Sequence, residues 1–208
     1  MDPKRYKTIK LLVRKVNKER KQQAKKIDIL CNNLVEAQRD FIKRLNAIAF
    51  AANFYESIVG ITDFNSLLYT AGKIIRNELP NANIAFFLRG QDNFELHLFE
   101  NNKPIALEKQ HLENCFTPEV VDNICKANKI CTLDDMFAMG LQGNLCKLNK
   151  ISALAVPLSR LGSALGFILI YHLSQNKLNV EELNNITSVT LGLARALQSC
   201  NGLSRAAK

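Results

Sequence analysis

The first quarter of the chain contains a long stretch without proline or glycine, from Lys4 to about Ala52. Its Lys, Arg, Gln, Asn, Leu, Ile and Ala residues are all compatible with a helix. A helix of about 48 residues is roughly 70 Å long, because each residue adds 1.5 Å. The rest of the chain amounts to one domain, which cannot cover that length, so part of the helix surface needs a second chain.

A seven-residue repeat runs through this stretch. Nine of the twelve core positions in its best register are apolar, and the exceptions are Arg20, Gln23 and Arg44. This period favours a coiled coil, and the alternative is a helix that lies on its own domain. We expect a homodimer whose contacts are made by Ile9, Val13, Val16, Ile27, Leu30, Leu34, Ala37 and Phe41.

The net charge of +9 is confined to the start of the chain. Residues 1–26 hold 11 Lys or Arg and two acidic residues, whereas the remainder holds 17 basic and 17 acidic residues. Like charges at helical neighbour spacing repel one another, for example Lys10 with Arg14 and Lys21 with Lys25. Residues 4–26 could therefore meet an anionic partner, which could be a membrane lipid, a nucleic acid or an acidic protein. The alternative is a simple solvated arm.

The six cysteines and the lengths of the apolar runs indicate the cellular compartment in which the protein is found. No two cysteines have C-x-x-C spacing, and no signal peptide is recognisable at the start. No run of about 18 apolar residues occurs, so we expect no transmembrane helix. These features favour a reducing, cytoplasmic location over a disulfide-bonded secreted one.

The pattern beyond the long helix predicts a mixed α and β domain. A helix capped by Thr62 or Asp63 is expected to end at Pro80, followed by strands over 82–89 and 94–99. A short helix over 118–127, a strand over 130–133 and a helical turn from Asp134 come next. Residues 140–149 have the composition of a loop.

A strand hairpin over 152–158 and 164–171 is the strongest β signal. Both faces of both strands are mostly apolar, so the hairpin should be central in the sheet and covered on both sides. Pro157 should lie at a bulge or an unpaired position. The last helix should begin at Asn179 and Glu182, which have capping-box spacing, and end near Gly202.

The segments "ALAVPLSRLGSALGFILIYH" and "LNVEELNNITSVTLGLARAL" resemble the closing part of a GAF domain, a bacterial-type sensory domain. "NIAFFLR" is similar to the first strand of that family and "KICTLDDM" to its strand-to-helix pocket edge. The resemblance implies an α+β fold in which an antiparallel sheet carries helices on one face and a ligand pocket on the other. The expected organisation is a basic helix over 1–50, a GAF-like domain over 51–201 and a tail over 202–208.

Positions expected around the implied pocket come from the strands and from the segment after residue 130. Asp134 and Asp135 could each accept hydrogen bonds from a ligand or simply cap the short helix. Some of the strand residues must face the helices instead, because successive side chains point to opposite faces. The candidate ligand contacts are Phe86, Leu88, His97, Phe99, Cys131, Asp134, Asp135, Met136 and Val156.

The resemblance leaves the ligand open and indicates a module without chemistry of its own. His97, His111 and His172 lack the spacing of a metal site, so no metal is expected, and no cofactor can be named. A GAF subfamily reduces free methionine sulfoxide with pocket cysteines, but its surrounding pattern is missing here. The expected function is a dimeric sensor that binds a small ligand and signals to a partner in trans. The alternatives are a ligand-free dimerisation adaptor, that reductase, or a nucleic-acid-binding arm.

Overall fold

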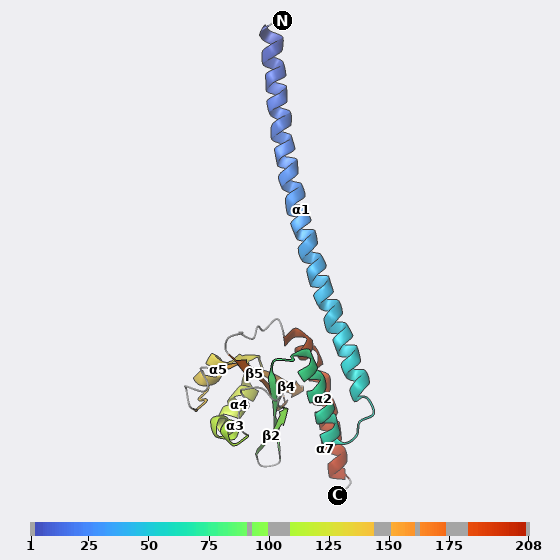
Figure 1. Cartoon of the computed structure of the whole chain (residues 1–208), viewed down its shortest axis with the longest axis vertical. Coiled ribbons are helices and arrows are strands. Elements are labelled where there is room, and N and C mark those ends of the chain that lie inside the picture. The colour runs from blue at the N-terminus through green and yellow to red at the C-terminus, as the bar shows by residue number, and fades with distance from the viewer. Residues whose placement is uncertain are drawn as a thin grey trace. The chain divides into compact units, whose positions relative to one another are not determined.

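The computed structural model describes residues 3–90, 93–99, 109–143, 151–160, 163–173 and 183–206. Figure 1 shows the helices and strands in chain order. Their bounds are α1 Pro3–Ile58, α2 Phe64–Glu78, β1 Asn83–Arg89, β2 Phe94–Phe99, α3 Lys109–Cys115, α4 Pro118–Ala127, β3 Cys131–Thr132, α5 Leu133–Ala138, β4 Ile151–Arg160, β5 Ser163–Leu173 and α7 Asn184–Ala206.

Helix α1 is continuous over 56 residues and belongs to two compact units. The first unit covers residues 1–46 and the second, which we call the globular unit, covers 47–208. Within the first unit the apolar core positions of the heptad repeat are open to solvent, and Leu34 is 70 % exposed.

The sheet has five strands in the order β2-β1-β5-β4-β3, and every neighbouring pair is antiparallel. The predicted hairpin is confirmed as β4 and β5 and is central, with β1 beside β5. Pro157 stays in register with Phe167, and the irregularity in the pairing falls one step later, between Leu158 and Ser159. Successive side chains of a strand point to opposite faces of the sheet, so alternate residues of each strand lie on the same face.

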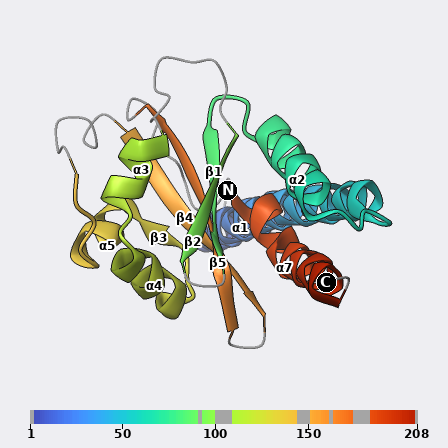
Figure 2. The ribbon, with the colours of Figure 1, turned by 90° about the horizontal axis from the view of Figure 1, so that it is seen from below.

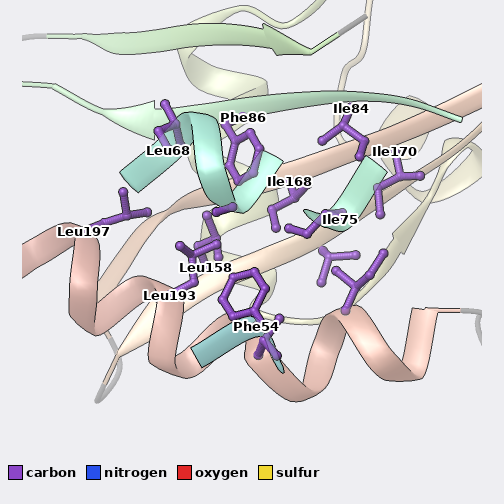
Figure 3. Close-up of a cluster of buried hydrophobic side chains, with 14 of the residues drawn as sticks. Phe54, Leu68, Ile75, Ile84, Phe86, Leu158, Ile168, Ile170, Leu193 and Leu197 are labelled. Carbon is purple, nitrogen blue, oxygen red and sulfur yellow. The ribbon is translucent and has the colours of Figure 1, made fainter. Parts of the chain in front are cut away.

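The first face of the sheet packs against α2, α7 and the end of α1, as the resemblance implied. Figure 3 shows side chains from all these elements meeting in one apolar core. Phe54 of α1 is completely buried there. Asp63 caps α2 by accepting a hydrogen bond from the Ser66 amide at 2.7 Å. Residues 47–58 of α1 are therefore part of the globular core.

The second face of the sheet is covered by α3, α4 and α5, on the side opposite α2 and α7 (Figure 2). Helix α4 has the predicted bounds, with Val120, Val121, Ile124 and Cys125 buried. Helix α3 was missed because the seven residues of Lys109–Cys115 are too short for a helical period to stand out.

Some expectations fall outside the described residues. The predicted start of the last helix at Asn179 and Glu182 is one of them, and part of the predicted loop over 140–149 is another. Among the helices that the structure describes, none has both the length and the hydropathy needed to cross a membrane.

Candidate functional site

On the second face of the sheet two alanines flank a leucine of the central strand, and we call these three residues the alanine floor. Ala85 of β1 and Ala155 of β4 both lie beside Leu169 of the central strand β5, and all three are buried. Alanine side chains rise little above the backbone, so larger side chains of the covering helices can approach the sheet closely here. In the described part of the chain, buried side chains of α4 belong to the same cluster.

Three phenylalanine rings gather beside this floor, and we call them the aromatic cluster. Phe87 of β1 stacks on its cross-strand partner Phe167 of β5, with ring centroids 4.7 Å apart. Phe116, which follows α3, lies 4.9 Å from Phe87 and 6.0 Å from Phe167. Aromatic pairs at these separations add stabilisation beyond the burial of their area. The cluster therefore occupies the part of the face where α3 ends.

Five of the nine expected ligand contacts lie on the first face instead. Phe86, Leu88 and Val156 belong to the core shared with α2 and α7, and Phe99 packs against it. His97 is on the same side, with its ring 6.1 Å from Phe64 of α2 and its Nε2 3.7 Å from Glu95. Successive side chains of a strand point to opposite faces of the sheet, so a shift of one residue exchanges the two faces. Because Phe86 and Phe87 are equally apolar, the sequence did not show which of them faces the pocket side.

The other four expected contacts lie at β3 and α5. Cys131 and Met136 are fully buried in the second-face cluster, whereas the Asp134 side chain is exposed. Asp135 and Thr132 form a reciprocal cap: the carboxylate of Asp135 accepts hydrogen bonds from the Thr132 amide and hydroxyl, at 2.8 and 2.7 Å. These hydrogen bonds lower the pKa of Asp135. The carboxylate is thus committed to holding the start of α5.

Phe87, Phe116 and Phe167 were not among the expected contacts. Phe87 adjoins Phe86 in a strand that is apolar on both sides, so the sequence carried no signal that favoured one of them over the other. Phe116 follows a helix too short to be recognised. Its position in the cluster is decided by the packing of α3 on the sheet.

The buried thiols of this region are held in their neutral form. Burial raises the pKa of Cys115 and Cys131, and it raises that of Cys125 to about 11. His111 Nε2 lies 3.8 Å from Cys115 Sγ. Because a thiolate is the reactive species, these cysteines have the character of core residues rather than nucleophiles.

We expect thiol reagents at neutral pH to react with exposed cysteines much faster than with buried ones. Cys31 on α1 is exposed, whereas Cys115, Cys125, Cys131 and Cys200 are buried. Iodoacetamide should modify Cys31 within minutes and Cys125 at least a hundred times more slowly, because a pKa near 11 leaves about one thiolate in 10⁴ at pH 7. Peptide mass spectrometry measures both rates. Equal labelling of Cys125 and Cys31 in the folded protein would contradict this assignment.

Within the described residues, no group of three or more His, Cys, Asp or Glu side chains is placed to hold a metal ion. No family model matches the sequence. No curated protein matches it either.

Several solved structures are similar to this chain. The GAF domain of a phosphoenolpyruvate-protein phosphotransferase from Coxiella burnetii has 12 % identity and a TM-score of 0.53, over 77 % of this chain and 98 % of that one. The corresponding GAF domain from Acinetobacter has 9 % identity and a TM-score of 0.54, over 76 % and 97 %. Free methionine-R-sulfoxide reductase from Neisseria meningitidis, solved with its substrate, has 16 % identity and a TM-score of 0.54, over 76 % and 93 %. At these identities the likeness concerns the fold.

Proposed function

We propose that this chain, which has a GAF fold, is a non-catalytic regulatory module that dimerises through α1 and binds a small, largely apolar ligand on the second face of its sheet. The observation that carries the proposal is the difference between the two faces. The first face is sealed by long helices, whereas the second has an alanine floor covered by the shorter helices α3, α4 and α5. Ligand sites are usually apolar and concave, with few polar groups.

The route for a signal runs through the sheet to the first face. A ligand that displaced the aromatic cluster would press on β1 and β5, whose opposite sides carry Phe86 and Ile168 in the first-face core. That core also holds Phe54 of α1 and Leu193 of α7. Such a signal requires the ligand to bind two arrangements of these helices with different affinity. The readout would then be a partner protein that recognises one arrangement.

A panel of small aromatic and aliphatic metabolites tests ligand binding, by thermal shift and then by titration calorimetry on the full chain. We expect at least one compound to bind, and Phe116→Leu to change its Kd about tenfold because Phe116 borders the floor. Phe64→Leu, a matched change on the first face, should leave the Kd unchanged. Absence of any binder would overturn the ligand part of the proposal, as would equal effects of the two variants.

A ligand-free adaptor is the second candidate, and the aromatic cluster favours it. Phe87, Phe116 and Phe167 already fill part of the second face with their own rings. In an adaptor Phe116→Leu would lower stability without affecting any binding event. The buried, neutral thiols Cys115, Cys125 and Cys131 do not favour the reductase chemistry of the Neisseria protein.

Dimerisation is common to both candidates and depends on the heptad positions of α1. Leu30 and Leu34 are core positions, 66 % and 70 % exposed in the single chain. We expect the wild-type chain to be a dimer at micromolar concentration and the variant Leu30→Lys with Leu34→Lys to be monomeric. A lysine pair in the seam loses two buried leucines and adds like charges between the chains. Sedimentation equilibrium measures the change.

The matched control places the same two lysines outside the seam, at Ile29 and Val35, which are also exposed. The Ile29→Lys, Val35→Lys variant should remain dimeric. A monomeric wild-type chain would contradict the coiled coil, as would a control variant that dissociates as readily as the seam variant.

A further inference from the structure

The charged residues of the first unit are arranged in a line along α1. Six basic residues recur at steps of three or four, and we call them the basic stripe: Lys7, Lys10, Arg14, Lys18, Lys21 and Lys25. At 3.6 residues per turn they fall within an arc of about 80° and extend over about 27 Å. All six side chains are exposed. Six of the eleven basic residues in 1–26 therefore lie along one narrow line on the helix.

The basic stripe is not neutralised by its own helix. Glu19 is the one acidic residue between Lys7 and Lys25, and it lies well outside the arc. Among the residues that the structure describes, no acidic side chain pairs with any of the six. Neighbouring like charges on a helix destabilise it, so five successive pairs of this kind act against the helix. An anionic partner would remove that repulsion.

The surface between the stripe residues offers hydrogen-bond donors. A shallow hollow on this part of α1 is lined by Arg14, Asn17, Lys18, Lys21, Gln22 and Lys25. The lining has four cations and two amides and contains no acidic or apolar side chain. This combination suits oxyanions such as phosphate, which accept hydrogen bonds from Lys, Arg and amide groups.

We propose that the basic stripe binds the phosphate backbone of duplex nucleic acid without reading its sequence. Five of the six residues occupy heptad positions that point away from the apolar seam, so a dimer partner and a nucleic acid can be bound together. The stripe contains no aromatic residue on which unpaired bases could stack, which favours a duplex over a single strand. Its length of about 27 Å matches about eight base pairs at 3.4 Å each.

A membrane surface fits the same residues less well. In an interfacial helix the apolar side enters the lipid. Here that orientation would turn the stripe residues that lie opposite the apolar seam, among them Arg14 and Lys18, away from the headgroups. Turning the stripe toward the headgroups would instead leave Ile9, Val13 and Val16 in water, unless a second chain covered them. In a dimer the second chain covers the apolar seam, while a duplex beside the helices binds the basic stripe.

The test is fluorescence anisotropy of a labelled 24-base-pair duplex of random sequence, titrated with the full chain at several salt concentrations. Binding should weaken with salt with a slope of log K against log [salt] near −5, since each phosphate contact contributes about −0.9. Lys18→Gln with Lys25→Gln should reduce the slope by about two and the affinity roughly 60-fold at 0.1 M salt. Glutamine retains helix propensity, and circular dichroism checks that α1 is intact.

The matched control is Lys15→Gln with Lys26→Gln, which removes the same charge from outside the stripe. It should lower the affinity by less than about fivefold. Equal losses for the two pairs would overturn the stripe as the binding surface. Tighter binding to phosphatidylserine vesicles or to polyglutamate than to the duplex would overturn the choice of partner, and absence of duplex binding at 50 mM salt would overturn the proposal altogether.

Discussion

Gly166→Ala should destabilise the globular unit by about 3 to 5 kcal/mol, a large part of its stability. Gly166 lies in the central strand β5 opposite Leu88 of β1 and Leu158 of β4, with φ of +144°. A Cβ atom at this position would overlap the carbonyl oxygen of Phe87 and lie 2.9 Å from its carbonyl carbon and 3.0 Å from Leu88 Cα. All these atoms are backbone in a paired strand, so no side chain can rotate to relieve the overlap.

The loss adds two separate costs. A non-glycine residue with this φ costs about 1 to 3 kcal/mol, and forcing two paired strands apart costs a similar amount. Native domains have only about 5 to 15 kcal/mol of stability in total. Urea unfolding followed by near-ultraviolet circular dichroism measures the effect, because that signal reports aromatic packing in the globular unit rather than the helix content of α1.

Gly60→Ala is the control for backbone strain alone. Gly60 also has a positive φ, +84°, but nothing lies within 4 Å of a Cβ built there. Its substitution should cost about 1 kcal/mol, the ordinary cost of a left-handed conformation. A loss at Gly166 no larger than that at Gly60 would show that the strands separate more easily than their pairing indicates.

Phe54→Ala should destabilise the globular unit by about 3 to 5 kcal/mol, the range for removing a fully buried phenylalanine. Phe54 is 0 % exposed, and its ring contacts those of Phe50 and Tyr55 at centroid distances of 6.1 and 5.8 Å. Its side chain inserts between the sheet and α7 with Leu193 and Leu158 nearby (Figure 3). The cavity left by alanine would therefore open where three elements meet.

Ile42→Ala on the same helix is the matched control. Ile42 lies outside the heptad seam and is 49 % exposed, so its truncation should change the stability of the globular unit by less than about 0.5 kcal/mol. Urea unfolding with the same near-ultraviolet signal compares the two variants. Similar losses for both would mean that residues 47–58 of α1 contribute through helix propensity and not through burial of Phe54.

The secondary structure followed from local patterns in most of the chain. The absence of proline and glycine between Lys4 and Ala52 indicated the long helix, and α1 is continuous from Pro3 to Ile58. Asp63 caps α2 as its position before an apolar helix suggested. The two-sided apolar segments after residue 150 predicted a central hairpin, and β4 and β5 are at the centre of the sheet. These features depend on neighbours a few residues apart, which the sequence displays directly.

The same reasoning predicted the residues of the candidate site much less well. A strand pattern has a period of two, but a strand buried on both sides is apolar at both phases. Phe86 and Phe87 therefore looked alike, although one faces α2 and α7 and the other faces Phe116 and Phe167. For Asp135 the sequence left a ligand contact and a helix cap open, and its hydrogen bonds with Thr132 show that it is a cap.

The sequence by itself determined most of the helices and strands, the basic stripe and the apolar seam of α1, because each depends on residues that are close together along the chain. Only the tertiary structure decided which side of each strand meets which helix. That choice depends on strand order and on contacts between residues more than 50 positions apart, such as Phe87 with Phe167. Side-chain packing in three dimensions sets those contacts, and no local pattern encodes them.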